Sequence, residues 1–317
     1  MNPLLVVAGN LIVDDVVFEN GITSLGQAGG AALYAALGAS LWGISVGIAS
    51  VVGNDYPDDV LEAVSDKGID LAGVRRVAGP SLKIWLLYEG RRRQVVHHLD
   101  SPSHAQMSPV LADLPSAWRP SAYHLAPMPL AVQIDWLDSL DSLASPVSQD
   151  GSSRVLLSLD LFDLVDEDSL APLQATFRRV DLALLSEDEL LLEAALESPE
   201  LCLARLAAGG EGATNRLERI LLKRGAQGGL VFDRGADSVR PWQPRASTIV
   251  EPTGAGDAFA GGLLAGLIVG RPLEGALEQA IVSASFALEG QGAEGLLAAT
   301  PADCAARSRE WFGGSPG

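Results

Sequence analysis

Short apolar segments alternate along the chain with segments whose apolar residues recur at helical spacing. The apolar segments predict buried strands at Leu4–Ala8, Ser45–Val51, Val155–Asp160, Leu182–Leu185, Ile220–Leu222 and Gly229–Phe232. The other segments predict helices near Ala31–Leu41, Pro57–Lys67, Ala131–Leu143, Leu190–Ala195 and Ala258–Leu267. This alternation predicts an α/β fold, in which a mostly parallel sheet carries helices on both faces.

Two stretches depart from the alternation and predict additional strands. Ile12–Ser24 is one of them, and Leu82–Tyr88 forms with Arg91–His97 a predicted β-hairpin around the turn Glu89-Gly90. Strands inserted into an α/β chain indicate a small β lid, built from about residues 12–24 and 82–97. We expect the lid to cover a ligand at the carboxyl ends of the main strands, and we interpret residues 1–317 as a single domain with this lid.

Composition and charge narrow the classes of partner. The 317 residues are enough for a sizeable core, and 48% hydrophobic with 20% charged residues is typical of a packed enzyme. The formal net charge of -18 repels phosphate backbones and anionic lipids, so we expect neither nucleic acid nor a membrane as partner. An anionic nucleotide would therefore need backbone N–H groups, a helix N-terminus or a few basic side chains.

The cysteines, the N-terminal segment and the glycine motifs argue against several classes of protein. Cys202 and Cys304 lie far apart, which indicates neither a disulfide framework nor a zinc site. Leu4–Ala8 is too short for a signal peptide and lacks a basic flank, so we predict a soluble cytoplasmic protein. No G-x-x-x-x-G-K-[ST] motif is present, and the G-x-G-x-x-G at Gly290–Gly295 follows a helical pattern instead of a strand.

The most informative segment is Glu251–Gly262, in which Gly254-Ala255-Gly256-Asp257 precedes an apolar helix with many small residues. A glycine-rich turn that opens a helix presents unpaired N–H groups and the positive end of the helix dipole, which together favour a bound phosphate. Asp257 could cap the helix or accept a proton from a substrate hydroxyl. For these four residues alone, an ordinary tight turn is an equally good interpretation.

The whole segment resembles the signature of the PfkB family of ribokinase-like kinases, in which Asp-Thr-x-Gly-Ala-Gly-Asp is followed by Phe and small residues. The resemblance implies a ribokinase-like fold and ATP-dependent phosphorylation of a hydroxyl on a small neutral acceptor such as a sugar, an inositol-like polyol or a nucleoside. It also implies that Asp257 is the general base, and that Gly254, Ala255 and Gly256 form the anion hole.

A second match lies near the N-terminus. Gly26–Leu37, followed by Trp42-Gly43 and Val51–Asp55, is similar to the family's Gly-Gly segment, its helix and its Gly-x-Asp turn. The acceptor-binding residues that the resemblance implies are Asn10, Asp14, Gly29, Gly30 and Tyr34. Without the resemblance, Gly29-Gly30 would indicate flexibility at a helix entry, and Asp14 a solvated strand end.

Two further matches concern the nucleotide. Ser186–Glu189 occupies the place of the family's Asn-x-x-Glu, and Lys223–Gly228 resembles its Thr-x-Gly-x-x-Gly loop. The resemblance implies that Mg²⁺ is organised by Glu189, and that ATP is contacted by Ser186, Lys223, Gly225 and Gly228. The alternative for Ser186–Glu189 is a helix N-cap with an acidic first turn.

Departures from the family pattern keep other functions open. Glu251 replaces the usual Asp, which argues against a monovalent-cation site; Ala31 and Tyr34 stand where Asn is common, and Ser186 replaces Asn. These changes motivate the alternative of a catalytically weak kinase-like binding or regulatory protein, either monomeric or homodimeric. A nicotinamide-dependent oxidoreductase would rest on the α/β pattern alone, without a fingerprint after the first strand.

Side chains on the acceptor side indicate an uncharged, ring-shaped acceptor. Asn10–Asp15, Gly26–Tyr34 and His124–Met128 contain no Lys or Arg that could neutralise a sugar phosphate. Tyr34, Trp85 and Tyr88 are predicted to offer it a flat apolar wall. We expect lid or surface positions for the histidines at 97, 98, 104 and 124, and a solvated hairpin tip for Arg91–Arg93.

Overall fold

The computed structural model describes residues 2–89, 92–143, 154–192, 198–208, 215–245 and 247–313. The chain divides into two compact units, one comprising Met1–Arg119 and Ser247–Gly317 and the other Pro120–Ala246. The interpretation of the whole chain as a single kinase domain stays a prediction. Among the described helices, none combines the length and the apolar character that crossing a membrane requires.

The first unit contains parallel strands in the order β1-β4-β5, with bounds β1 (Leu5–Ala8), β4 (Val46–Val52) and β5 (Asp70–Arg76). Every residue of β1 and β4 is buried, as expected for parallel strands covered on both faces. Helix α1 (Ala31–Ser40) packs on β1 and β4, and α2 (Asp58–Asp66) packs on β5.

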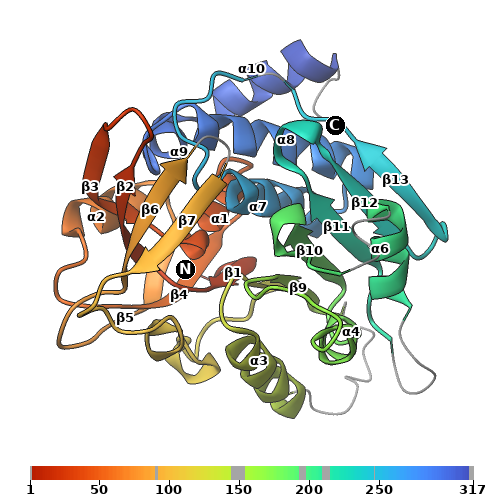
Figure 1. Cartoon of the computed structure of the whole chain (residues 1–317), viewed down its shortest axis with the longest axis horizontal. Coiled ribbons are helices and arrows are strands. Elements are labelled where there is room, and N and C mark those ends of the chain that lie inside the picture. The colour runs from red at the N-terminus through yellow and green to blue at the C-terminus, as the bar shows by residue number, and fades with distance from the viewer. Residues whose placement is uncertain are drawn as a thin grey trace. The chain divides into compact units, whose positions relative to one another are not determined.

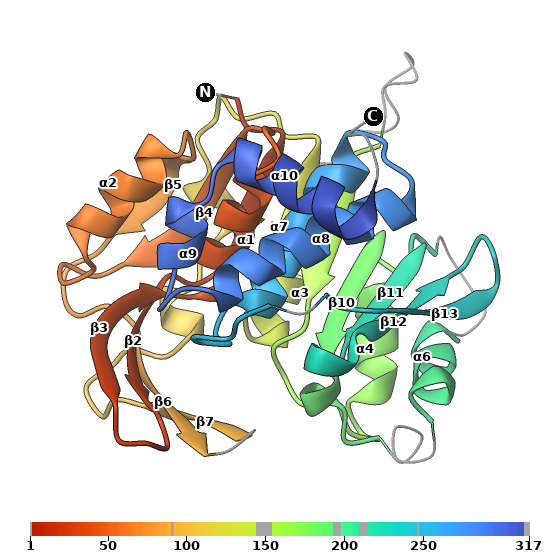
Figure 2. The same cartoon turned by 90° about the horizontal axis from the view of Figure 1, so that it is seen from above.

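Helices near the C-terminus complete this unit. They are α7 (Ala255–Ile268), α8 (Leu273–Leu288), α9 (Glu294–Ala298) and α10 (Pro301–Phe312). Helices α1, α7 and α8 pack against one another (Figure 2). Glycines allow the close approach, since a Cβ at Gly261 would lie 2.0 Å from the carbonyl oxygen of Ala35 and one at Gly38 would lie 2.5 Å from that of Ala258. The N-terminal half of α7 is therefore held against α1 by close backbone packing.

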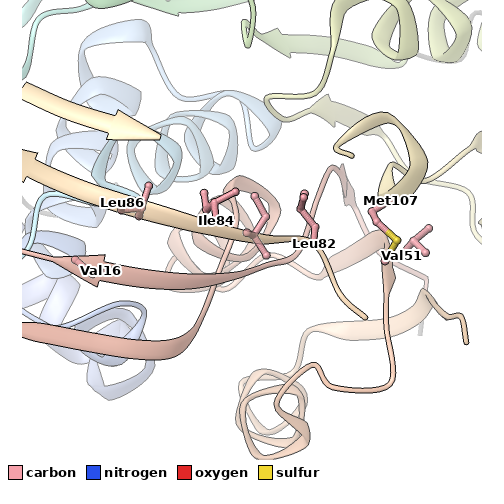
Figure 3. Packing of buried hydrophobic residues seen from close by; sticks show 7 residues of the cluster. Val16, Val51, Leu82, Ile84, Leu86 and Met107 are labelled. Carbon is pink, nitrogen blue, oxygen red and sulfur yellow. The ribbon is translucent and has the colours of Figure 1, made fainter. Parts of the chain in front are cut away.

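The first unit also carries a small separate sheet with strand order β3-β2-β6-β7 (Figure 1), which confirms the inserted strands. Its strands are β2 (Ile12–Val17), β3 (Thr23–Gly29), β6 (Lys83–Glu89) and β7 (Arg92–His97). One face is apolar and packs on β4 and on the 3₁₀ turn Ala105–Met107 (Figure 3), through Ile12, Val16, Val51, Leu82, Ile84, Leu86 and Met107. Alternate side chains of β2 and β6 thus build a core under the sheet.

The second unit has the strand order β13-β12-β11-β10-β9-β8. The strands β8 (Ala122–Leu125), β9 (Leu156–Asp160), β10 (Leu182–Ser186) and β11 (Arg219–Lys223) are parallel, whereas β12 (Gly229–Asp233) and β13 (Ser238–Trp242) are antiparallel. Its helices are α3 (Leu130–Leu143), α4 (Leu170–Phe177) and α6 (Pro199–Ala207). The mostly parallel α/β class is therefore confirmed.

The helix predicted for Leu190–Ala195 is not present in its first half, since residues 190–192 are not helical, and 193–195 lie outside the described residues. The backbone of the first half pairs with Val165 instead: the Val165 N–H donates to the Glu189 carbonyl and the Leu191 N–H donates to the Val165 carbonyl, both at 2.8 Å. The strands β5, β8 and β13 went unpredicted; β8 is only Ala-Tyr-His-Leu, too short to show a period.

Candidate active site

The glycine-rich turn opens helix α7. Gly254 is the N-cap in the left-handed region, with φ of 76°, and its carbonyl accepts the Ala258 N–H at 2.8 Å. A positive φ favours glycine, which explains the residue at this position. The helix begins at Ala255, three residues earlier than predicted, so Asp257 lies half-buried in its first turn. The N–H groups and the dipole of this helix end are suited to an anion.

Asp14 and the Gly29-Gly30 pair are in contact. Asp14 lies on β2 and is 3% exposed, so it is not a solvated strand end. A Cβ at Gly29 would lie 2.0 Å from Oδ2 of Asp14, and one at Gly30, where φ is 100°, would lie 2.4 Å from the Asn10 carbonyl oxygen. Only glycine fits this passage from β3 into α1. The carboxylate of Asp14 is thereby held at the entrance to the helix.

Asn10 performs a structural task in the same region. Its side-chain amide is buried and donates to the His104 carbonyl oxygen at 3.2 Å and to the Ser108 hydroxyl at 3.3 Å. The amide therefore anchors the segment around the 3₁₀ turn Ala105–Met107 to the end of β1. Its contact with an acceptor stays a prediction.

Tyr34, an expected acceptor-binding residue, lies in contact with the glycine turn. The side chain is 2% exposed, and its ring lies against Gly254, where an added Cβ would lie 2.2 Å from ring carbons. Burial raises the pKa of Tyr34 well above its usual value, and the nearby charges of Asp14, Glu251 and Asp257 raise it further. The phenol therefore stays protonated, and these three carboxylates, distant in sequence, lie close enough to it to act electrostatically.

Glu251 is fully buried. Its Oε2 accepts the N–H of Gly292 at 3.0 Å, which ties the start of the glycine turn to the loop between α8 and α9. Its Oε1 has no hydrogen-bond partner within the described ranges. The loop includes the G-x-G-x-x-G segment, which follows helix α8 as predicted and makes no dinucleotide fingerprint.

The predicted aromatic wall is wrong for Trp85. Successive side chains of a strand point to opposite faces, so Trp85 and Tyr88 lie on opposite faces of β6. Trp85 stacks on His98 with ring centroids 4.9 Å apart, whereas Tyr88 stacks on Phe18 at 5.6 Å and its hydroxyl lies 2.5 Å from Thr253 Oγ1. Tyr88 is the aromatic residue of β6 that reaches the glycine turn.

The predicted nucleotide residues gather at the carboxyl ends of β10 and β11. Ser186 ends β10 and pairs in register with Lys223 at the end of β11. Glu189, in the 3₁₀ turn Glu187–Glu189, accepts the Ser186 N–H at 2.7 Å through Oε2. This is the capping geometry that the sequence allowed as an alternative. The role of Glu189 toward Mg²⁺ stays a prediction.

The loop after β11 is shaped by two glycines. Gly225 and Gly228 have positive φ values of 53° and 78° around the 3₁₀ turn Gly225–Gln227. A Cβ at Gly228 would lie 2.2 Å from the Trp242 carbonyl oxygen, so the loop runs tightly against β13. The loop therefore needs glycine at 228 for its own backbone contact, independently of a ligand.

Lys223 forms an ion pair that sequence reasoning missed. Its Nζ lies 2.6 Å from Oδ2 of Asp160, which ends β9 and is fully buried, while the Lys223 side chain is 10% exposed. Since β10 lies between β9 and β11, the lysine side chain crosses the end of β10. Asp160 could have been identified from the sequence, because it is a carboxylate at the end of an apolar strand.

His124 also belongs to this cluster, and its predicted lid or surface position is wrong. It lies on β8, is fully buried, and its Nδ1 is 3.1 Å from the Ser158 hydroxyl. His104 is buried as well, whereas His97 is exposed on β7 as expected. The burial of these two rings follows from tertiary packing. The spacing of the histidines in the sequence does not indicate it.

Acid is expected to destabilise the protein through His124. Burial lowers the pKa of His124 from 6.5 to about 4, Lys223 lowers it further, and Asp160 opposes the shift. As the pH falls, the unfolded chain therefore protonates His124 at a higher pH than the folded protein does. The contribution of neutral His124 to the free energy of unfolding is complete above pH 6.5, and up to roughly 3 kcal/mol of it is lost toward pH 4. Urea unfolding across this range should show a shallower pH slope for His124→Asn. An identical slope in both proteins would contradict the assignment.

The other candidates considered from the sequence were metal-binding groups, the two cysteines and the arginines of the hairpin. Within the described part of the chain, no group of three or more His, Cys, Asp and Glu side chains could hold a metal ion. Cys202 and Cys304 are buried free thiols. Arg91 lies outside the described residues, and only the backbone of Arg92 and Arg93 is described, in β7.

Similar proteins were found by sequence and by structure. Residues 25–299 match the model of the pfkB family of carbohydrate kinases. The chain is 29% identical over 273 residues to the cytidine kinase of Thermococcus kodakarensis, a match that covers 85% of this chain and 90% of that protein.

Among solved structures, the nucleoside kinase of Burkholderia thailandensis in complex with inosine has a TM-score of 0.74 at 17% identity, covering 98% of this chain and 100% of that chain. A putative ribokinase II from E. coli in complex with ATP and Mg²⁺ has a TM-score of 0.71 at 17% identity, covering 98% and 99%. At this identity, the structural likeness shows the fold.

Proposed function

The chain belongs to the pfkB family of carbohydrate kinases, and we propose that it transfers a phosphoryl group from ATP to a hydroxyl of a neutral nucleoside. The coarser part of this statement, an ATP-dependent small-molecule kinase, follows from the family and from the kinases that the chain resembles. The choice of a nucleoside is supported by the similarity to a cytidine kinase and by a nucleoside kinase among the structural relatives.

One observation carries the proposal: Tyr34 on α1 lies with its ring against Gly254, which brings the acceptor-side residues before α1 next to the turn that carries Asp257. Asp14 lies against Gly29, and Asp257 lies in the first turn of α7. A carboxylate that holds acceptor hydroxyls and a carboxylate at a phosphate-binding helix end are the two groups that phosphoryl transfer to an alcohol needs. Both belong to the first unit.

In the proposed reaction, Asp257 accepts the proton of the acceptor hydroxyl as the oxygen forms its bond to the γ-phosphorus of ATP. The bond between that phosphorus and the oxygen of the leaving ADP breaks in the same step. N–H groups of Ala255 and Gly256 at the start of α7 stabilise the charge on the transferred group. Asp14 orients the acceptor, and the protonated Tyr34 remains available as a hydrogen-bond donor beside both carboxylates.

The residues proposed for ATP and Mg²⁺ fit these ligands chemically. The loop Lys223–Gly228 has glycine turns and a lysine, and Glu189 supplies a carboxylate oxygen of the kind that Mg²⁺ prefers. Mg²⁺ usually keeps several waters and binds phosphates with one or two carboxylates, so a single protein carboxylate is compatible with it. When bound, the ion would neutralise phosphate charge; the protein's own part is to hold Glu189 in place through the Ser186 N–H.

The charge of the acceptor side supports a neutral acceptor. Asn10–Asp15 and Gly26–Tyr34 contribute buried carboxylate, amide and apolar groups, without a basic side chain. Lys83 on β6 is already paired with Asp55 at 2.7 Å. A phosphorylated acceptor would place a dianion beside Asp14 and Asp257, which is strongly unfavourable. The segment His124–Met128 belongs to the other unit.

A screen of acceptors with ATP and Mg²⁺ tests this proposal. We expect at least one nucleoside to have a kcat/KM about tenfold or more above that of ribose, myo-inositol or ribose 5-phosphate, measured as product formation by ³¹P NMR. The Asp257→Asn protein serves as the control for contaminating kinases. A kcat/KM for ribose 5-phosphate tenfold above every neutral compound would overturn the choice of a neutral acceptor.

A further inference from the structure

A polar contact joins the small sheet to the glycine turn. The hydroxyl of Tyr88, at the end of β6, lies 2.5 Å from Oγ1 of Thr253. Thr253 is 7% exposed and directly precedes Gly254, the left-handed N-cap of α7. All three residues belong to the first unit. The contact therefore connects the small sheet to the start of the helix that carries Asp257.

Tyr88 is held in this position by its own sheet. Its ring is stacked on Phe18, which follows β2, with 5.6 Å between ring centroids and 13° between the ring planes. Both rings pack against the apolar cluster, in which Ile84 and Leu86 come from the same strand as Tyr88 (Figure 3). Because residues two apart share one face of a strand, this cluster fixes the direction of the phenol.

We propose that Tyr88 is a positioning residue for phosphoryl transfer, which acts by holding Thr253 and thereby the N–H groups of Gly254–Gly256. This inference rests on the proposed function of the glycine turn. Gly254 has no side chain that could fix the left-handed turn, and Thr253 is the residue directly before it. A displacement of about 1 Å in groups that orient a reaction can lower its rate on the order of 10²-fold.

The contact distinguishes Tyr88 from the exposed apolar side chains of the small sheet and its turns. Ile22, Leu25, Val95 and Val96 of the small sheet and its turns are each about half exposed, whereas Tyr88 turns its hydroxyl onto Thr253. The small sheet therefore contributes to the site through a defined hydrogen bond in addition to the apolar core beneath it.

The test is a double-mutant cycle with Tyr88→Phe and Thr253→Val. Tyr88→Phe removes only the hydroxyl and keeps the stack on Phe18; Thr253→Val removes the other partner at nearly constant volume. We expect each single variant to lower kcat by roughly 10- to 100-fold while KM for ATP changes less than about threefold. The double variant should be no slower than the slower single variant, because both changes remove one contact.

Two matched controls separate positioning from a general loss of structure. Thr253→Ser keeps the hydroxyl and should retain kcat within about threefold of the wild-type protein. Tyr123→Phe makes the same chemical change on β8 of the other unit and should leave kcat unchanged. All variants should unfold at temperatures within a few degrees of the wild-type protein.

Hydrogen exchange provides a readout that does not require turnover. In Tyr88→Phe, the amides of residues 254–257 should exchange at least tenfold faster than in the wild-type protein. Unchanged exchange, or a double variant whose loss equals the product of the two single losses, would overturn the inference. If the wild-type protein transferred phosphate to no acceptor, the proposed function would fail, and the exchange measurement would still decide whether Tyr88 orders the turn.

Discussion

Asp257→Asn is expected to lower kcat by about 10²- to 10⁴-fold with acceptor and ATP saturating, because it removes the proposed proton acceptor. Asn has nearly the same size, and the N-cap of α7 is Gly254, so the turn at Gly254 and the start of α7 should persist. ATP binding, measured by calorimetry, should therefore change less than about threefold. The loss should appear in kcat and not in KM for the acceptor.

The control for this variant is Glu274→Gln, which removes an acidic charge from the first turn of α8. A charge at a helix N-terminus stabilises a protein by about 0.3–1 kcal/mol, so Glu274→Gln should lower the free energy of unfolding slightly and leave kcat unchanged. If Asp257→Asn lowered kcat less than tenfold, Asp257 would be an acidic residue of the first helical turn and not the base. The assignment of the reaction to the start of α7 would then need another proton acceptor.

Lys223→Met is expected to lower the free energy of unfolding by about 3–5 kcal/mol at pH 7, because it leaves the charge of Asp160 buried and unpaired. Asp160 is fully buried, and the Lys223 ammonium lies 2.6 Å from its Oδ2. The second carboxylate oxygen, Oδ1, has no hydrogen-bond partner within the described part of the chain. The lysine is thus the main source of neutralising charge for this carboxylate.

The double variant Lys223→Met with Asp160→Asn distinguishes charge from packing. Removing both charges should restore most of the lost stability, since replacing a buried ion pair by neutral groups often costs little. Urea unfolding at pH 7 measures each value. Equal destabilisation in the single and double variants would show that Lys223 stabilises the unit by packing instead. Loss of ATP binding in a stable double variant would support the nucleotide role proposed for Lys223.

Much of the fold was predictable from local pattern. Buried parallel strands appear in the sequence as short apolar runs, so β1, β4, β9, β10, β11 and β12 were found within one or two residues. The alternation with helices predicted the α/β class, and the inserted strands predicted the small sheet. The failures were short or mixed strands, and residues 190–192, which pair with Val165 at Leu191 and are not helical as expected.

The candidate site was predictable only in part. The glycine turn was predicted because a positive φ and a helix start leave a local pattern of residues, whereas the role of Asp257 was implied by the resemblance to the family signature. The aromatic wall failed for Trp85 because residues three apart in one strand lie on opposite faces, so Trp85 stacks on His98 and cannot share a face with Tyr88. His124 was placed at the surface, since a single histidine in a four-residue strand carries no sign of its burial.

The sequence by itself thus determined six strands of the main sheet, four of the helices, the class of fold, and the glycine turn that begins α7, because each depends on residues close together in the chain. Only the tertiary structure decided the pairings: Tyr34 with Gly254, Lys223 with Asp160, and Tyr88 with Thr253. The partners in these pairs are far apart in the sequence, and no local periodicity records them. They meet because strand order and helix packing bring distant segments together, and a buried charge or hydroxyl is stable only where such a partner exists.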